Sequence, residues 1–319
     1  MLTLLKLLKD GRFHSGEALG AALGVSRSAV WKQLQQLEAE LGLSIHKVRG
    51  RGYQLSSPLV LLEEQSIVAN GPSPSWPVHV YDSIDSTNAE ALRLVAQGAP
   101  APFIVVAERQ TSGRGRRGRQ WVSPFAENIY YSLLLRIDGG MRQLEGLSLV
   151  VGLAVLRVLR DRGLPGVGLK WPNDVLVGRK KIAGILLELV GDPADVCHVV
   201  LGIGINANMQ VAEQIDQPWT SVRAELGSAV DRNHLVSSLG KKLQEYLELH
   251  REAGFAALQA EWQQYHLWQG REVSLVAGIN SIHGTVLGID QQGALRLEVD
   301  GVEKVFNGGE LSLRLRDDV

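Results

Sequence analysis

Residues 181–205 read KIAGILLELVGDPADVCHVVLGIGI and contain two long runs of apolar residues. The runs, at residues 181–190 and 196–205, have the length and composition of strands that are buried in a sheet. Gly191-Asp192 separates the two runs and Gly178-Arg179 precedes the first, and glycine at such points is typical of a hairpin turn. We therefore predict that strands at 175–177, 181–190 and 196–205 are antiparallel neighbours.

Strand and helix patterns alternate on both sides of this segment, between residues 78 and 265. Further strands are expected at residues 78–81, 103–107, 128–136 and 168–171. Helices are expected from Ser86 onward and at residues 141–162, 232–250 and 255–265. Because helices alternate with strands that are joined by tight turns, this region is predicted to be an α+β domain with a mixed sheet.

Residues 110–121, QTSGRGRRGRQW, follow the strand predicted at 103–107, and we call them the arginine loop. Its four arginines offer planar, permanently charged donors to phosphate and carboxylate, and its glycines allow the backbone to approach a ligand closely. The spacing is neither that of a P-loop nor that of a dinucleotide fingerprint. A solvated basic face or a nucleic-acid patch is the alternative. We expect a loop that binds a polyanion and becomes fixed when the polyanion is present.

Residues 1–57 predict three helices followed by a hairpin. Ser15 and Ser26 suit the caps of the second and third helices, and Val30, Leu34 and Leu37 would face a small core. The third helix would then present polar and basic groups to DNA, and the hairpin at 45–55 would form a wing. The predicted DNA-binding residues are Ser26, Arg27, Ser28, Trp31, Lys32, Gln35, Lys47, Arg49 and Arg51. A helical docking module with a solvated basic face is the alternative.

Changes in composition divide the chain into four segments. Residues 58–77 contain four prolines around one short apolar piece, which is typical of a linker. Five short strand patterns, punctuated by glycine, predict a small β-barrel at residues 269–319. They lie at residues 272–276, 282–289, 294–299, 302–306 and 311–315. We expect a winged-helix DNA-binding domain at 1–57, a linker at 58–77, a ligand-binding domain at 78–268 and the barrel at 269–319.

Composition limits the possible classes of protein. The chain has 319 residues, of which 45% are hydrophobic and 21% charged, as in ordinary globular proteins with several domains. Residues 1–57 carry eight Lys and Arg against four Asp and Glu, whereas the remainder carries 25 against 30, so the basic end suits a nucleic acid. Cys197 is the single cysteine, which excludes an internal disulfide and a thiolate metal cluster. With no signal-peptide pattern and no apolar stretch of membrane-spanning length, we expect a cytoplasmic protein without membrane contact.

Four further segments place polar groups at the ends of predicted elements. Ser86-Thr87-Asn88 begins a helix, where free N–H groups and side chains can hold a neutral polar ligand. KWPND at 170–174 is a corner between strands, KIAGIL at 181–186 places a lysine beside small residues, and GIGIN at 202–206 ends a buried strand. Each alone is equally explained by a helix cap, a turn or a solvated lysine. Together they predict one cleft around the sheet.

The motifs GRGRRGRQW, KWPND, KIAGIL and GIGIN, in this order and spacing, resemble those of the biotin–protein ligases. The winged helix and the closing GGELSLR resemble the bifunctional bacterial form, which is also the repressor of the biotin operon. The resemblance covers nearly the whole chain, and residues 207–221 are its least similar part. It implies a catalytic domain like those of class II synthetases and an SH3-like C-terminal barrel.

The resemblance implies an acyl-adenylate reaction with ATP and biotin as substrates. Biotin is activated to biotinyl-5′-AMP and then transferred to a lysine of a biotin carboxyl carrier protein. The implied catalytic residues are Lys181, Arg116 and Arg114. The implied biotin-binding residues are Ser86, Thr87, Asn88, Gln110, Arg114, Gly115, Arg116 and Lys181. The implied ATP-binding residues are Arg116, Arg119, Trp121, Lys170, Asn173 and Asn206. Mg²⁺ would arrive with ATP, and no dedicated metal site is expected.

The resemblance also implies operator DNA as a partner and biotinyl-5′-AMP as a corepressor that favours a homodimer. Two alternative functions remain. The first is a lipoate–protein ligase with the same chemistry, against which the arginine loop and the winged helix argue. The second is a ligand-sensing transcription factor with an inactive enzyme domain, against which Lys181 and the arginine loop argue.

Overall fold

The computed structural model describes residues 2–138, 140–192, 196–309 and 311–316. The chain divides into two compact units, residues 1–62 with 124–126 and residues 63–123 with 127–319. Each unit is described by itself. Glu310 of the closing GGELSLR lies outside the described residues.

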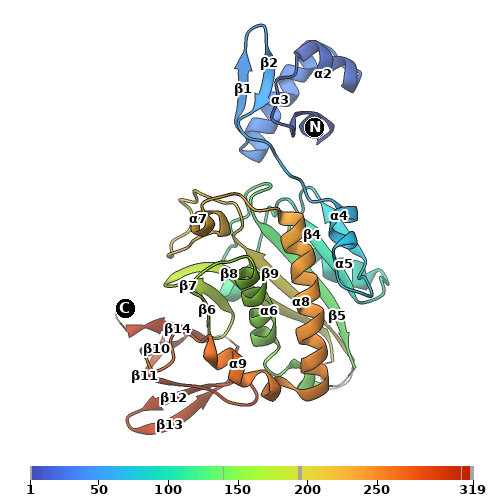
Figure 1. Cartoon of the computed structure of the whole chain (residues 1–319). Coiled ribbons are helices and arrows are strands. Elements are labelled where there is room, and N and C mark those ends of the chain that lie inside the picture. Colours follow the sequence, from blue (N-terminus) through green and yellow to red (C-terminus); the bar gives the residue numbers. More distant parts are fainter. Residues whose placement is uncertain (1, 139, 193–195, 310, 317–319) are drawn as a thin grey trace. The chain divides into compact units, whose positions relative to one another are not determined.

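The smaller unit is a winged helix (Figure 1). Its elements are α1 (Leu2–Leu8), α2 (Gly16–Leu23), α3 (Arg27–Leu41) and the antiparallel wing formed by β1 (Ile45–Val48) and β2 (Gly52–Leu55). The Ser15 Oγ accepts a hydrogen bond from the Ala18 N–H, and the Ser26 Oγ accepts one from Ala29, so both predicted caps are confirmed. Val30, Leu34 and Leu37 are fully buried on the core side of α3, as their spacing predicts.

The larger unit is built on a seven-stranded mixed sheet in the order β3-β4-β5-β9-β8-β7-β6 (Figure 1). Its strands are β3 (Val78–Tyr81), β4 (Phe103–Ala107), β5 (Ile129–Ile137), β6 (Val167–Lys170), β7 (Asp174–Val177), β8 (Lys180–Gly191) and β9 (Cys197–Ile205). The predicted antiparallel run of β7, β8 and β9 is confirmed, and β3 and β4 are parallel. β9 lies between β8 and the sequence-distant β5, so its Gly202 and Gly204 are at the centre of the sheet.

Helices pack on this sheet. Their bounds are α4 (Glu64–Ala69), α5 (Thr87–Ala96), α6 (Leu147–Asp161), α7 (Val222–Leu226), α8 (Arg232–Ala253) and α9 (Gln259–Gln264), with short 3₁₀ turns η1 (Arg116–Gly118), η2 (Met141–Leu144) and η3 (Phe255–Ala257). α5 packs on β4, β5 and β9, while α6 and α8 lie side by side (Figure 1). None of the described helices is both long and apolar enough to cross a membrane.

Two helices that the sequence predicts as continuous are each interrupted in the structure. The helix expected at 141–162 is divided into η2 and α6, and the one expected at 255–265 into η3 and α9. Gly146, which precedes α6, has φ +65°, and a Cβ there would overlap the ring of Phe255. The chain turns at Gly146 because this packing and this backbone conformation both require glycine.

The C-terminal part of the larger unit is a five-stranded antiparallel sheet in the order β13-β12-β11-β10-β14. Its strands are β10 (Glu272–Ala277), β11 (Asn280–Ile289), β12 (Leu295–Val299), β13 (Val302–Phe306) and β14 (Leu311–Leu315), so all five predicted strands are present. The buried indole N–H of Trp171 donates to the Gly293 carbonyl at 3.0 Å. This bond ties the KWPND corner of the mixed sheet to the C-terminal sheet.

Candidate active site

The arginine loop closes on itself above the sheet. Its first residue, Gln110, forms a parallel bridge to Ile84, and its two arms are joined by hydrogen bonds from Gly115 N to Arg119 O and from Trp121 N to Gly113 O. A Cβ on Gly113 would lie 2.7 Å from the Trp121 carbonyl oxygen, so glycine permits this close approach. The loop therefore returns to the sheet at Trp121, close to where it departs.

Neutral polar side chains meet at the N-terminus of α5. The backbone N–H and the hydroxyl of Thr87 both donate to the Gln110 Oε1, at 2.8 and 3.1 Å, and the Ser132 hydroxyl lies 2.8 Å from the Thr87 Oγ1. Ser86, Thr87 and Asn88 are each only 4% exposed. The structure thus brings Ser86, Thr87, Asn88 and Gln110 together in a pocket that also reaches the other predicted biotin-binding residues, Arg114, Gly115, Arg116 and Lys181.

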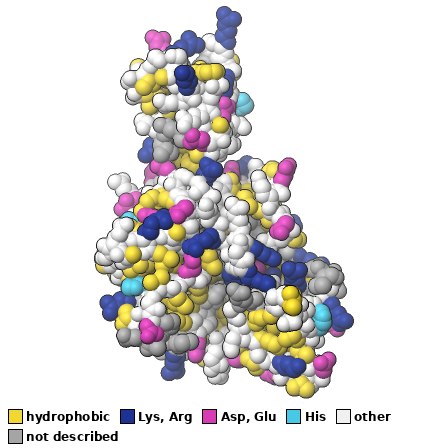
Figure 2. Space-filling view, turned by 180° about the vertical axis from the view of Figure 1, so that it is seen from behind, with side chains coloured by type: hydrophobic (Ala, Val, Ile, Leu, Met, Phe, Trp, Pro, Cys, Tyr) yellow, Lys and Arg dark blue, Asp and Glu magenta, His cyan; other side chains and the backbone are white. Residues whose placement is uncertain are grey.

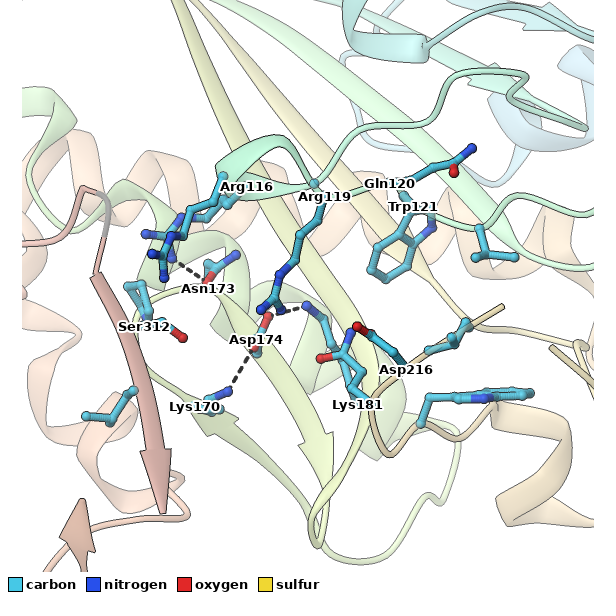
Figure 3. Close-up of a pocket in the computed structure, with 18 of the residues that line it drawn as sticks. Arg116, Arg119, Gln120, Trp121, Lys170, Asn173, Asp174, Lys181, Asp216 and Ser312 are labelled. Atoms are coloured by element: carbon cyan, nitrogen blue, oxygen red, sulfur yellow. Dashed lines mark hydrogen bonds and ion pairs between the residues drawn. The ribbon is translucent and has the colours of Figure 1, made fainter. Parts of the chain in front are cut away.

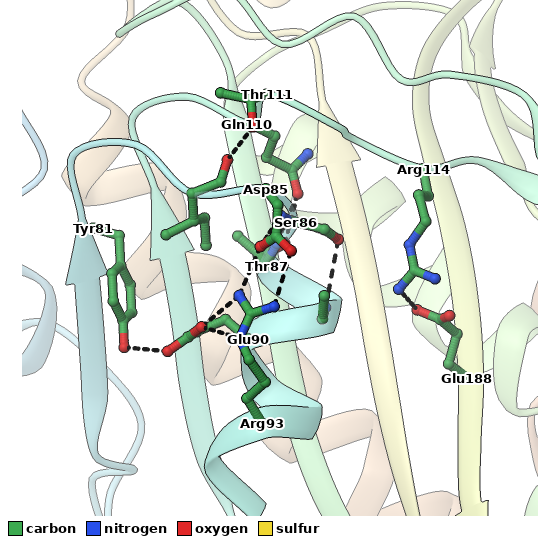
Figure 4. Close-up of polar contacts among 12 residues, drawn as sticks. Tyr81, Asp85, Ser86, Thr87, Glu90, Arg93, Gln110, Thr111, Arg114 and Glu188 are labelled. Atoms are coloured by element: carbon green, nitrogen blue, oxygen red, sulfur yellow. Dashed lines mark hydrogen bonds and ion pairs between the residues drawn. The ribbon is translucent and has the colours of Figure 1, made fainter.

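Asn88 is held by the protein itself. Its Nδ2 donates to the Glu188 carboxylate at 2.7 Å and to the Leu186 carbonyl at 3.4 Å, and its Oδ1 accepts from the Ser132 hydroxyl at 2.5 Å. Glu188 also pairs with Arg114 at 2.9 Å (Figure 4). The sequence interpretation missed Glu188, although an acidic residue within the apolar strand of residues 181–190 is a usable signal.

A surface ion-pair network supports the same helix N-terminus. Arg93 in α5 pairs with Asp85 through both terminal nitrogens and with Glu90, which accepts a hydrogen bond from the Tyr81 hydroxyl (Figure 4). The hydrogen bonds from Arg93 lower the pKa of Asp85 to about 2. Asp85 also accepts from the Ser86 N–H at 2.8 Å, so this network fixes the start of α5.

Two glycines in β9 make room for the groups that lie over it. A Cβ on Gly202 would overlap the side-chain amide of Asn88, and a Cβ on Gly204 would overlap the indole of Trp121. In the neighbouring strand β8, a Cβ on Gly184 would lie 3.1 Å from the same indole. The small residues of KIAGIL and GIGIN therefore let α5 and the arginine loop rest directly on the strand backbones.

Charged side chains gather around Asp174 in the adjoining pocket. The Asp174 carboxylate lies 2.6 Å from Lys181 Nζ and 3.3 Å from Lys170 Nζ, and Figure 3 shows Arg119 pointing toward the same group. Burial opposes the ionisation of Asp174, but the two ammonium groups prevail and lower its pKa. Burial lowers the pKa of Lys170 despite the attraction of Asp174. Asp174 thus keeps two mutually repelling cations close together at the end of the cleft.

This second pocket encloses about 330 Å³ and includes parts of the chain that sequence analysis missed. Arg116 donates to the Asn173 Oδ1 at 2.8 Å and to the carbonyls of Leu311 and Gly309 in the C-terminal part of the unit.

Some of the lining residues were not predicted from the sequence. Asp216 and Trp219 come from residues 207–221, the least similar part of the sequence, and Ser312 belongs to β14 (Figure 3). The side-chain amide of Asn206 donates to the carbonyls of Lys181 in β8 and of Thr220, so it connects the segment of residues 207–221 to β8. No local sequence signal marks Ser312.

Lys and Arg side chains also gather at the surface of the larger unit, near the middle of the face that Figure 2 shows. A positively charged region of this kind attracts anionic ligands. Within the described residues, no group of three or more His, Cys, Asp and Glu side chains is placed to hold a metal ion.

The predicted DNA-contacting residues of the smaller unit are all exposed on α3 or the wing. Trp31 is 44% exposed, which leaves its side chain accessible to a partner. Lys47 pairs with Glu38 at 2.5 Å, and the Arg51 guanidinium lies over the Phe13 ring at 4.2 Å. These two contacts orient basic groups near the wing.

Fold and site together define an enzyme that joins two anionic substrates and carries a DNA-binding domain. Sequence profiles match the helix-turn-helix domain at residues 1–54, the Biotin/lipoate A/B protein ligase family at 80–206 and the biotin protein ligase C-terminal domain at 270–314. The bifunctional ligase/repressor BirA of Salmonella typhimurium is 43% identical over 98% of this chain and 97% of its own length, and that of Escherichia coli is 41% identical over the same shares. The chain belongs to the family of bifunctional biotin–protein ligases and repressors.

A ligase and a solved structure cover the catalytic part. The biotin–[acetyl-CoA-carboxylase] ligase of Paracoccus denitrificans is 38% identical over 70% of this chain and 98% of its own length. The biotin protein ligase of Aquifex aeolicus in complex with biotin and ATP superposes with a TM-score of 0.67 at 32% identity. That superposition covers 75% of this chain and 99% of the Aquifex chain.

Proposed function

We propose that the chain activates biotin in the cleft between α5 and β14. The biotin carboxylate attacks the α-phosphate of ATP, which gives biotinyl-5′-AMP and pyrophosphate. The amine of a carrier-protein lysine then attacks the acyl carbon, which releases AMP and leaves biotin in amide linkage. The observation that carries this proposal is that Arg116, Trp121 and Lys181 line both pockets, so one set of groups faces both substrates.

The arrangement of side chains supports the assignment of substrate ends. The neutral donors and acceptors of Ser86, Thr87 and Gln110 suit the uncharged ureido ring of biotin. The ammonium group of Lys181 suits the biotin carboxylate and the α-phosphate of ATP. Arg116, Arg119, Lys170, Asn173 and Asn206 would contact phosphate, ribose or base. Two anions repel each other, and preorganised cations offset this repulsion more strongly as charge develops in the transition state.

Trp121 and the arginine loop would cover the adenylate. The Trp121 indole lies over Gly204, and the distance from Lys181 Nζ to the centre of the indole ring is 5.5 Å. A closed loop would exclude water from the mixed anhydride until the carrier lysine arrives. Mg²⁺ would reduce the charge of the triphosphate; the Asp174 carboxylate is already paired with two lysines, so we propose that the ion arrives on ATP.

Mass-shift labelling tests this function. The protein is incubated with ATP, a biotin carboxyl carrier domain and either biotin or lipoate, and the mass of the carrier is then measured. We expect the mass of one biotinyl group on one lysine, and none in a carrier variant with that lysine changed to arginine. Lipoyl transfer at an equal rate would indicate a lipoate ligase, and no transfer at all would indicate an inactive enzyme domain.

We further propose that biotinyl-5′-AMP favours a homodimer through the edge of β8. β7 pairs with β8 over residues 180–184, and Asn173 bonds both backbone groups of Ile185; within the described residues, no strand pairs with that edge beyond Ile185. Leu189 and Val190 are 47% and 46% exposed there, and an open strand edge can pair with a second copy. Equilibrium sedimentation should show ligand-dependent association that Leu189→Lys weakens, whereas adenylate synthesis should continue. Association that is unaffected by ligand would contradict the proposal.

The winged helix would place two copies of α3 on paired half-sites of operator DNA. Arg27→Ala and Lys32→Ala should each weaken binding of duplex DNA from upstream of biotin-synthesis genes. Each loss of a phosphate contact should reduce the slope of log affinity against log salt by about one. Unchanged affinity and slope in both variants would favour the docking-module alternative.

A further inference from the structure

A buried ion pair in the larger unit lies outside both pockets. Arg232, the first residue of α8, has its Nη1 2.7 Å from the Glu108 carboxylate, and the two side chains are only 1% and 2% exposed. The same Nη1 donates to the Asn128 carbonyl at 3.3 Å. Neither Arg232 nor Glu108 lines the biotin pocket or the nucleotide pocket.

Glu108 and Asn128 are the residues at the two ends of the segment that carries the arginine loop. Glu108 directly follows β4, Asn128 directly precedes β5, and residues 109–127 lie between them. Each end is also hydrogen-bonded to the sheet region: Glu108 N donates to the Tyr81 carbonyl at 2.8 Å, and the Asn128 Oδ1 accepts from Ala207 N at 3.0 Å. One guanidinium therefore contacts both ends of the segment.

We propose that Arg232 is a positioning residue for biotin activation, because it sets the spacing of Glu108 and Asn128, the two ends of the segment that carries the arginine loop. A segment with fixed ends loses less conformational entropy when it closes on a ligand. A planar guanidinium with several donors can bond a carboxylate and a carbonyl at once, whereas an ammonium bonds each of them as a point charge. With the ends fixed, Arg114, Arg116 and Trp121 reach the same places over the ligand each time the loop closes. This role rests on the proposed function of the loop.

The test compares Arg232→Met with Arg157→Met. Arg157 of α6 makes a less buried ion pair with Glu261 in the same unit; it lines neither pocket, and no contact with residues 109–127 is found in the described structure. Trypsin cleavage after Arg114, Arg116, Arg117 and Arg119 is followed by mass spectrometry, with and without biotin plus ATP. Melting temperature, kcat and the KM values for biotin and ATP are measured on the same samples.

In the wild type, biotin plus ATP should protect the loop from trypsin. Arg232→Met should lose this protection and raise both KM values at least tenfold, and Arg157→Met should keep the protection even if its melting temperature falls as far. Arg232→Lys should restore part of the protection because it keeps the charge beside Glu108. If Arg232→Met does not fold, Glu108→Gln replaces it, with the same loss of protection expected.

Wild-type protection in Arg232→Met, or in Glu108→Gln where that variant is used, would overturn the positioning role. Equal loss of protection in Arg157→Met would also overturn it, because the effect would then follow stability alone. An active wild type with no ligand-dependent protection would refute the lid function of the loop. A wild type without any biotin transfer would instead refute the proposed ligase reaction, so the failures are distinguishable.

Discussion

The two ends of the ligand cleft are built in opposite ways. The end at α5 consists of neutral side chains that are 4% exposed and hydrogen-bonded to each other, such as Ser86 and Thr87. The end formed by the rest of the arginine loop is rich in cations, and Arg117 and Arg119, which line it, are exposed. Under the proposed function, this difference would let the preformed neutral framework select the vitamin and the charged loop bring the two anions together.

Removal of the Lys181 ammonium, which lines both pockets, should have the largest effect on the reaction rate. We expect Lys181→Ala to lower kcat for adenylate formation by about 10²–10³, the usual effect of losing one preorganised charge-stabilising group. Pyrophosphate exchange measures the rate, and circular dichroism checks the fold. Lys180→Ala is the matched control, because Lys180 is adjacent and exposed and lines neither pocket. Equal losses in both variants would remove the role assigned to Lys181.

Displacement of the loop tryptophan should have the next largest effect. Gly204→Ala places a methyl group in the space of the Trp121 indole, and such overpacking costs about 1–3 kcal/mol. We expect KM for ATP to rise about 10–100-fold, since each 1.4 kcal/mol is tenfold. Gly152→Ala in α6 is the control, because its added Cβ would make only an ordinary 3.5 Å contact. Wild-type kinetic constants in Gly204→Ala would show that the position of the Trp121 indole over Gly204 is not required for ATP binding.

Loss of one hydroxyl in the rigid framework should have a smaller effect that is confined to biotin. Thr87→Val keeps the shape but removes the Oγ1 that bonds Gln110 and Ser132, which costs about 1–2 kcal/mol. We expect KM for biotin to rise about tenfold with KM for ATP unchanged. Thr111→Val, at an exposed loop position, should change neither value. A rise in KM for ATP alone would contradict the assignment of the two ends.

The free energy of unfolding should depend weakly on pH because of the ionisation of Asp85. Its folded-state pKa of about 2 is below the usual 3.8, so its contribution is fully present above about pH 4 and is lost as pH falls toward 2. Both partners are nearly half exposed, so the contribution should stay below about 1 kcal/mol. Urea unfolding of Asp85→Asn and the wild type should differ at pH 7 and converge near pH 2. A difference that grows in acid would contradict this sign.

Sequence patterns predicted the local structure well where the cause is local. Ser15, Ser26 and Ser86 cap helices because a hydroxyl satisfies a nearby free N–H group, and this depends only on neighbours in the chain. The strand runs in residues 181–205 and the turns beside them were likewise readable. The break before α6 was not, because it depends on the ring of Phe255, more than a hundred residues away.

The candidate site divides in the same way. Motif spacing named Lys181, Trp121 and the polar groups of α5, and the structure brings them into adjoining pockets. Asp174 belongs to the KWPND motif but was assigned no role, because its importance comes from burial between two lysines. Ser312 was missed because β14 reaches the pocket only in the folded chain.

The sequence by itself determined the elements, the cationic loop and the family, because periodicity, capping and motif spacing act over short distances. Only the tertiary structure decided that β9 lies between β5 and β8, that Glu188 holds Arg114 and Asn88, and that Arg232 contacts both ends of the loop segment. These contacts join residues far apart in the chain. Packing and the burial of charge select them together, and no local pattern encodes that selection.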